Sequence, residues 1–354
     1  MKFQADSLPL LIGSLPMADH TIATRLMLKY TPEIPLWIQL PCYSEERLLS
    51  QFSVCLPGIK GEGDSLHFET EGEAFNGELL AFFEEYMAVS EGGQPLSQSR
   101  FAMTGKRAQG FEAFFKVLSR AGVSPLAVKG QITGPFTLLT GLKDQHGRIA
   151  YYNQELREAI VKAVAMQARY QIERLKTLSN GVILFLDEPA LAGFGSSALV
   201  SIQKEEVITQ LNEIMDEVHQ RGALVGVHVC ANTDWGMLLS TSIDILSFDA
   251  FGFLDRMLLF KDAVAAFIER GGIIAWGLVP TLNQEDLANA NVEGLFAKWQ
   301  ACVQALGLDM ETARRQSLVT PSCGTGCLSL ELAIKAMDLT RELSSAIMYE
   351  TIPH

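Results

Sequence analysis

Short runs of apolar and β-branched residues recur along this chain, and a turn and a stretch with helical periodicity follow most of them. Several of the runs are apolar at every position, which is typical of strands that are covered on both faces. The pattern predicts eight strands, at residues 9–13, 35–40, 126–130, 182–187, 224–229, 244–249, 272–277 and 317–320. Strands that alternate with helices pair in parallel through right-handed crossovers.

The segments between the strands carry apolar residues at spacings of three and four, with charged residues on the opposite face. The clearest predicted helices cover residues 154–178, 204–221, 257–270, 284–306 and 328–347. Eight strands in such an alternation favour an α/β fold closed as a (β/α)8 TIM barrel, with an open parallel sheet as the alternative. Residues 42–110 do not fit the alternation, and we expect an insertion after the second strand that ends in a helix. The prediction is a single TIM-barrel domain over residues 1–354.

Composition and charge narrow the classes of function. The net charge of −13 argues against a nucleic-acid partner, because phosphate binding needs clustered Lys and Arg. The longest apolar runs are the length of strands, so we expect no membrane span. The first residues lack the pattern of a signal peptide, and six cysteines are too few for a disulfide framework in a chain of this length. We therefore expect reduced thiols and a cytoplasmic protein.

Residues that can bind a metal follow three of the last four predicted strands. His228 and Cys230 follow the fifth strand, Asp249 follows the sixth and Cys323 follows the eighth. The carboxyl ends of barrel strands meet at one face, where TIM-barrel active sites lie, and residues two apart on a strand point to the same side. One imidazole, two thiols and a carboxylate suit tetrahedral Zn²⁺. The alternative is a buried cysteine beside a hydrogen-bonded structural histidine.

Two carboxylates follow the strongly apolar fourth strand, in the sequence Asp187-Glu188-Pro189. An aspartate at such a place can cap a helix or lie on a surface loop. It can also bind a cationic group of a substrate, such as an amine. Ser14 follows the first strand, where a serine is also common in turns. The sequence alone leaves both readings open at both positions.

Six segments occur in a specific order and spacing: "LIGSLP" near the start, then "ITGPFTL", "LDEPAL", the H-x-C pair, "DILSFDA" and "TPSCG". Together, over residues 10 to 340, they resemble the catalytic C-terminal barrel of cobalamin-independent methionine synthase, here as a single-barrel short form. The superfamily also contains uroporphyrinogen decarboxylases and zinc-dependent methylcobamide:thiol methyltransferases.

The resemblance implies a zinc site that binds the sulfur of homocysteine as a thiolate, which then accepts a methyl group. His228, Cys230 and Cys323 occupy the positions of the family's ligands. Asp249 stands where the family has a glutamate ligand and is one methylene shorter. By its spacing, Cys327, four residues after Cys323, is either an alternative fourth ligand or a packing residue at the start of a helix.

The resemblance also implies residues for the amino-acid part of the substrate. Asp187 matches the carboxylate that holds the amino group of homocysteine, and we expect it to be essential for catalysis. Ile12 and Ser14 match the segment that contacts the substrate carboxylate. Glu73 is a candidate for a second amine-binding glutamate.

Two departures from the family concern the methyl donor. The segment "WGLVPT" after the seventh strand lacks the family's histidine, and residues 138–141 lack the aromatic residue that stacks on the folate. These losses favour a methylated corrinoid, delivered by a corrinoid protein, over a folate. The segment "DQHGR" at 144–148 does not match the corrinoid-carrier motif, so the chain is not expected to hold a corrinoid itself.

The function predicted is a zinc-dependent methyltransferase that methylates a small-molecule thiol, most simply homocysteine to methionine. A uroporphyrinogen decarboxylase-like enzyme is one alternative, although only Arg256 closely follows a strand from the fourth to the eighth. Methylation of coenzyme M is another, and that thiol has no amino group for Asp187. The third alternative is a barrel that binds zinc without catalysis.

Overall fold

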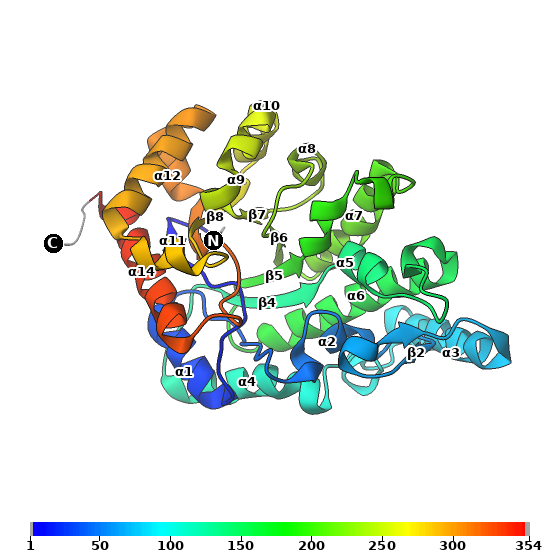
Figure 1. Ribbon diagram of the computed structural model, residues 1–354. Coiled ribbons are helices and arrows are strands. Elements are labelled where there is room, and N and C mark those ends of the chain that lie inside the picture. The colour runs from blue at the N-terminus through cyan, green and yellow to red at the C-terminus, as the bar shows by residue number, and fades with distance from the viewer. Residues whose placement is uncertain (1–2, 351–354) are drawn as a thin grey trace.

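Seven parallel strands form a curled sheet at the centre of the molecule (Figure 1). The computed structural model describes residues 3–350. The order across the sheet is β1-β9-β8-β7-β6-β5-β4. The strands are β1 (Leu8–Pro9), β4 (Val128–Thr133), β5 (Val182–Asp187), β6 (Leu224–Val229), β7 (Ile245–Phe248), β8 (Ile273–Val279) and β9 (Ser317–Pro321).

Residues 34–40 lie between the two edges of this sheet, where the second strand was expected. Two isolated parallel bridges join them to the edges, Ser14 with Gln39 and Leu36 with Lys129. Further backbone bonds run from Gln39 N to Gly13 O and from Lys129 N to Pro35 O. Pro35 has no N–H, so the segment cannot form a complete ladder. The fold is therefore an α/β fold of the TIM-barrel kind with seven regular strands, and the second predicted strand is replaced by a bridged segment.

Helices surround the sheet on its outer side (Figure 1). Buried apolar residues form a large cluster shared by strands and helices and a second, smaller cluster made mostly of strand residues, as expected for strands covered on both faces. The α-helices are α1 (His20–Tyr30), α2 (Ser50–Ser53), α3 (Gly72–Ser90), α4 (Gln109–Ala121), α5 (Pro135–Gly141), α6 (Gln154–Leu175), α7 (Lys204–Gln220), α8 (Trp235–Leu239), α9 (Ala250–Met257), α10 (Lys261–Glu269), α11 (Gln284–Asn289), α12 (Val292–Leu306), α13 (Met310–Arg315) and α14 (Leu330–Tyr349).

Two of the predicted helices are divided in the structure. The segment 284–306 forms α11 and α12, because the side chain of Asn291 accepts a hydrogen bond from Gly294 N and starts a new helix there. The segment 257–270 contains the end of α9, a short 3₁₀ turn and α10. The predictions for 154–178, 204–221 and 328–347 are confirmed by α6, α7 and α14.

Residues 42–110 form a layer of their own beside the sheet. It contains α2, α3 and the short antiparallel pair β2 (Ile59–Lys60) and β3 (His67–Phe68). An ion pair of 2.8 Å between Lys60 and Glu78 ties β2 to α3, and α3 packs against α6. No helix within residues 3–350 is long and apolar enough to cross a membrane.

Candidate metal and substrate site

Three polar side chains stand in register at the carboxyl ends of neighbouring strands. Asp187 at the end of β5 pairs with His228 in β6, and His228 pairs with Ser247 in β7. Parallel pairing of this kind aligns the strand ends, so residues far apart in the sequence meet at one face of the sheet.

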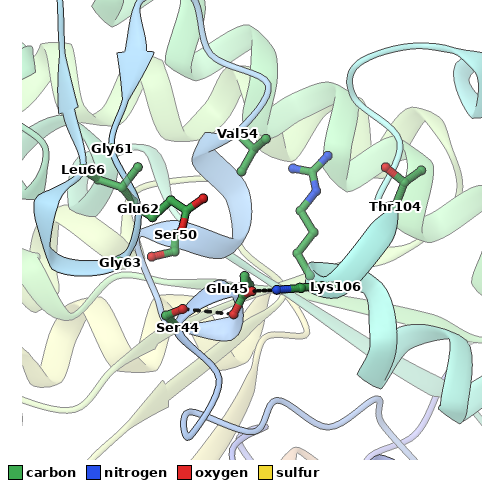
Figure 2. Close-up of a pocket in the computed structure, with 11 residues that line it drawn as sticks. Ser44, Glu45, Ser50, Val54, Gly61, Glu62, Gly63, Leu66, Thr104 and Lys106 are labelled. Atoms are coloured by element: carbon green, nitrogen blue, oxygen red, sulfur yellow. Dashed lines mark hydrogen bonds and ion pairs between the residues drawn. The ribbon is translucent and has the colours of Figure 1, made fainter.

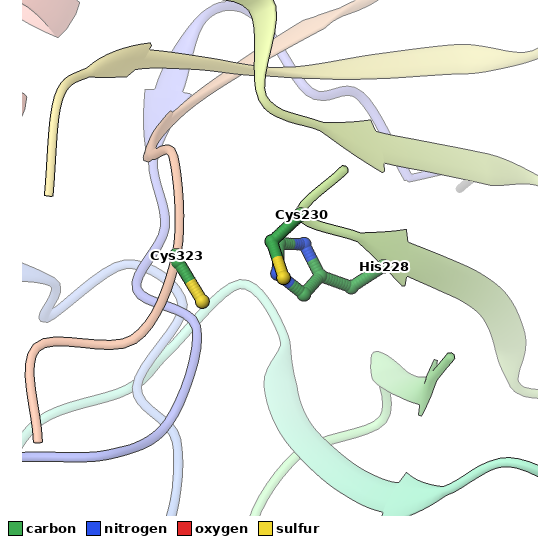
Figure 3. Close-up of side chains that lie close together, drawn as sticks. All are labelled: His228, Cys230 and Cys323. Atoms are coloured by element: carbon green, nitrogen blue, oxygen red, sulfur yellow. The ribbon is translucent and has the colours of Figure 1, made fainter. Parts of the chain in front are cut away.

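His228, Cys230 and Cys323 form a cluster of metal-binding side chains (Figure 3). One ligand atom from each residue lies within 4.8 Å of the ligand atoms of the other two. His228 lies near the end of β6, and Cys230 is the first residue after that strand. Cys323 comes from the loop after β9. Figure 3 shows the Cys323 side chain on one side of the cluster and the Cys230 and His228 side chains on the other. The sequence prediction that these three residues meet agrees with this arrangement.

The histidine of the cluster is oriented by a neighbouring strand. Its Nδ1 lies 2.9 Å from Ser247 Oγ, while its Nε2 is buried and has no hydrogen-bond partner. When Nδ1 donates its proton to the serine, the lone pair of Nε2 is free. A buried nitrogen with a free lone pair beside two thiols is the donor set that zinc prefers. The residues present therefore fit a zinc ion.

The two thiols of the cluster influence each other's protonation. The Cys323 thiol, as a hydrogen-bond donor to a Cys230 thiolate, lowers the pKa of Cys230 to about 4, and His228 acts in the same direction. The same pairing and burial raise the pKa of Cys323. The pairing thus favours the thiolate form of Cys230, which favours capture of a cation.

Small residues allow the loop that carries Cys323 to approach the first strand. A Cβ atom on Gly324 would lie 2.2 Å from Ser14 Oγ, and a Cβ atom on Gly326 would lie 2.8 Å from Pro41 Cγ. Thr281 fixes the loop from the other side, since its Oγ1 accepts from Cys323 N at 2.9 Å and donates to Cys323 O at 3.0 Å. A side chain at either glycine of "SCGTG" would therefore require Ser14 or Pro41 to shift.

Asp249 does not join the cluster among the described residues. Its Oδ1 accepts a hydrogen bond of 2.8 Å from Gly252 N, so the carboxylate caps α9. Burial raises the pKa of Asp249, and the nearby charge of Cys230 contributes in the same direction. One oxygen of this carboxylate is therefore engaged by the helix N-terminus, and the expectation that Asp249 completes the metal site stays a prediction. Cys327, the alternative ligand, is exposed and also lies outside the cluster.

Asp187 lies beside the cluster with an unused hydrogen-bonding atom. Its Oδ1 is buried without a partner. Burial raises the pKa of Asp187, whereas Lys129 and His228 act to lower it. A buried carboxylate oxygen without a donor is costly, so a ligand that donates a hydrogen bond there would be stabilised.

The second carboxylate of the pair has a structural task. Glu188 is fully buried and accepts hydrogen bonds from Phe136 N at 2.9 Å, Thr137 N at 2.8 Å and Thr137 Oγ1 at 2.6 Å. It therefore caps the start of α5, and Gly134 leaves room for it, because a Cβ atom there would lie 2.3 Å from the carboxylate. Burial raises the pKa of Glu188 to about 7.

Ile12 and Ser14 lie where the sequence predicted, next to the Cys323 loop. Both line a small cavity of about 10 Å³ with Cys323, and Ser14 Oγ accepts from Gly326 N at 3.2 Å. Glu73 is exposed in the first turn of α3, and no contact among the described residues connects it with the cluster. The structure thus brings together five of the predicted site residues, namely Ile12, Ser14, Asp187, His228 and Cys230, around Cys323, and it leaves Glu73 apart.

Two residues of the site were not predicted. Ser247 orients His228, and Lys129 lies buried in the barrel with its Nζ 2.5 Å from Ile12 O. Burial lowers the pKa of Lys129 to about 8, while the charge of Asp187 opposes that shift. Ser247 is the one polar residue of β7, and Lys129 is the charged residue of the fully buried β4; these are the signals by which the sequence could have indicated them.

No protein-family model and no curated protein matches the sequence. Among solved structures, the chain is similar to a B12-independent methionine synthase from Shewanella sp. W3-18-1, determined in complex with selenomethionine. The identity is 16%, the TM-score is 0.60, and the match covers 97% of this chain and 99% of that chain. The resemblance to the methionine synthase barrel, predicted from the ordered motifs, is confirmed at the level of the fold.

Proposed function

We propose that this protein is a zinc-dependent methyltransferase that methylates the thiol of homocysteine to give methionine. The observation that carries the proposal is the cluster of His228, Cys230 and Cys323 at the carboxyl ends of the strands, with the free, buried Nε2 of His228. The similarity to a methionine synthase structure supports the same class of activity. The single barrel domain over residues 1–354, the insertion at 42–110 and a cytoplasmic location belong to this proposal.

A zinc ion held by these three residues would act as a Lewis acid that keeps a substrate thiol deprotonated at neutral pH. The chain's own residues prepare the site for this chemistry. Ser247 fixes the imidazole of His228, and the pairing of Cys230 with Cys323 supplies one thiolate in advance. Because Asp249 Oδ1 is engaged at the start of α9, His228, Cys230 and Cys323 would hold the zinc ion, and the thiol sulfur of the substrate would be free to bind it.

Asp187 is proposed to bind the amino group of the substrate. Its unpartnered Oδ1 can accept a hydrogen bond from an ammonium group, and the paired charges stabilise each other in a buried setting. Ile12 and Ser14 are proposed to contact the substrate carboxylate. Glu73 is exposed in α3 and has no contact with the cluster in the described structure. A role in binding the amine would therefore require α3 to rearrange.

The reaction transfers a methyl group from a donor to the substrate sulfur. The thiol proton would pass to solvent water, and the S–CH₃ bond would form as the donor–CH₃ bond breaks, with the electron pair of the broken bond left on the donor. The donor proposed from the sequence is a methylated corrinoid, because the histidine and the aromatic residue associated with folate are missing from the expected segments. The bond to cobalt breaks without a need to protonate the leaving group.

The experiment is a methyl-transfer assay with homocysteine and zinc-loaded protein, run in parallel with methylcobalamin and with methyltetrahydrofolate. We expect methionine from methylcobalamin and its loss in Cys323→Ser. Cys327→Ser is the matched control, since this cysteine is exposed and outside the cluster, and it should keep the activity. Bound zinc without methionine from either donor would contradict the proposal and would indicate a non-catalytic zinc-binding barrel.

A further inference from the structure

A pocket of about 280 Å³ lies in the layer formed by residues 44–107 and shares no lining residue with the cluster (Figure 2). Three segments line it: residues 44–54, the turn 61–66 between β2 and β3, and residues 104–107. Figure 2 shows Leu66 and Glu62 on one side and Thr104 and Lys106 on the other, with Val54 between them. The pocket therefore opens between β2–β3 and the segment that precedes α4.

Arg107 lines this pocket with a charge that no carboxylate neutralises. Its side chain is 8% exposed, and it donates to Ala102 O at 2.9 Å and to Gln51 O at 3.5 Å. Both acceptors are uncharged, and within residues 3–350 no carboxylate forms an ion pair with this guanidinium. The ionisable groups that act on it are Cys55 and Tyr170, and burial raises the pKa of Cys55 to about 11.

The other cation of the pocket is already paired. Lys106 lies 3.0 Å from Glu45, and Glu45 also accepts a hydrogen bond from Ser44 at 3.0 Å (Figure 2). The remaining charged lining residue, Glu62, is exposed. The net charge of the four charged lining residues is zero, yet the buried guanidinium of Arg107 has only neutral hydrogen-bond partners. A buried charge in this state is stabilised by an anion that reaches it.

We propose that this pocket binds a small monocarboxylate with a short apolar body, whose carboxylate pairs with Arg107. The planar guanidinium fork matches a carboxylate in a bidentate geometry. Val54, which is 60% exposed, and Leu66 offer apolar surface for the body of the ligand. A phosphate dianion suits the pocket less well, because Glu45 and Glu62 stand at its walls. The site does not depend on the function proposed for the cluster.

The test is isothermal titration calorimetry of the full chain with isovalerate, with isoamylamine as the cation of equal shape and with inorganic phosphate. We expect saturable binding of isovalerate at one site per chain, and weaker or no binding of the amine and of phosphate. Absence of saturable binding of isovalerate overturns the proposal. Tighter binding of phosphate than of isovalerate overturns the assignment to a carboxylate.

Arg107→Met is expected to weaken isovalerate binding by at least about 10-fold, since a charged hydrogen bond is lost. Arg315→Met is the matched control, because it removes the same charge from an exposed ion pair with Glu311 away from the pocket, and it should bind as the wild type does. If Arg107→Met does not fold, Arg107→Lys replaces it in the test. This variant keeps the positive charge but loses the bidentate guanidinium, so it should bind isovalerate more weakly than the wild type does. Equal affinity of the folded variant and the wild type overturns the role of Arg107.

Discussion

The hydrogen bond between His228 and Ser247 gives a quantitative prediction about zinc affinity. Ser247→Ala removes the only partner of Nδ1 in the described structure, so the imidazole loses the contact that fixes its orientation and its tautomer. Ser247 is 1% exposed, and water therefore cannot replace the hydroxyl without a rearrangement of the strand ends. We expect the apparent dissociation constant for zinc to rise about 10–100-fold, the range found when the outer partner of a metal-binding histidine is removed.

This range corresponds to about 1.4–2.8 kcal/mol, since each tenfold change is about 1.4 kcal/mol. The magnitude agrees with the structure, because a buried N–H left without an acceptor costs about 1–3 kcal/mol. The assay is a competition titration with a zinc chelator of known affinity. Circular dichroism of the same samples verifies that the variant is folded.

Thr320→Val is the matched control for this substitution. Thr320 is fully buried in β9, and its Oγ1 has no hydrogen-bond partner, so the change removes a hydroxyl without removing a contact. Its zinc affinity should equal that of the wild type. Equal zinc affinity of Ser247→Ala and the wild type would refute the reasoning, because the serine would then have no part in presenting Nε2.

Three further predictions concern the carboxylates and the loop. Because burial places the folded-state pKa of Glu188 near 7, above the ordinary 4.5, the proton is held more tightly in the folded state, and stability falls as the pH rises through this window. In urea titrations, the unfolding free energy of the wild type should fall by about 3 kcal/mol relative to that of Glu188→Gln as the pH rises from 4.5 to about 7. A difference in unfolding free energy between the two proteins that does not change with pH would contradict this. Asp187→Asn should raise the KM for homocysteine about 10–100-fold while the zinc content stays unchanged. If the wild type methylates a thiol without an amino group as well as it methylates homocysteine, Asp187 does not bind the amino group. Gly324→Ala should lower the Tm, because its Cβ would lie 2.2 Å from Ser14 Oγ, whereas Gly77→Ala in α3, with nothing within 4 Å, should not.

The sequence was most informative about the cluster, for a physical reason. Parallel strands align their carboxyl ends, so residues that follow different strands come together whatever their separation along the chain. His228 and Cys230 follow β6 and Cys323 follows β9, and the structure brings them together as predicted. The barrel-like sheet followed from the same alternation of apolar runs and helices, apart from the bridged segment 34–40.

Asp249 shows a choice that reasoning from strand ends leaves open. A carboxylate after a strand can bind a metal or cap the next helix, and the choice depends on the backbone of the following residues. Here Gly252 N points at Oδ1, and α9 begins directly after Asp249. Lys129 and Arg107 were missed because their partners lie on other segments, and only the tertiary structure shows which acceptors reach them.

Zinc X-ray absorption spectroscopy, with and without homocysteine, tests the central claim most directly. The account predicts a zinc ion with one nitrogen and two sulfur ligands from His228, Cys230 and Cys323, and a third sulfur when homocysteine is added. A sulfur count that remains unchanged on addition of homocysteine, or a wild-type protein that does not retain zinc, would contradict it.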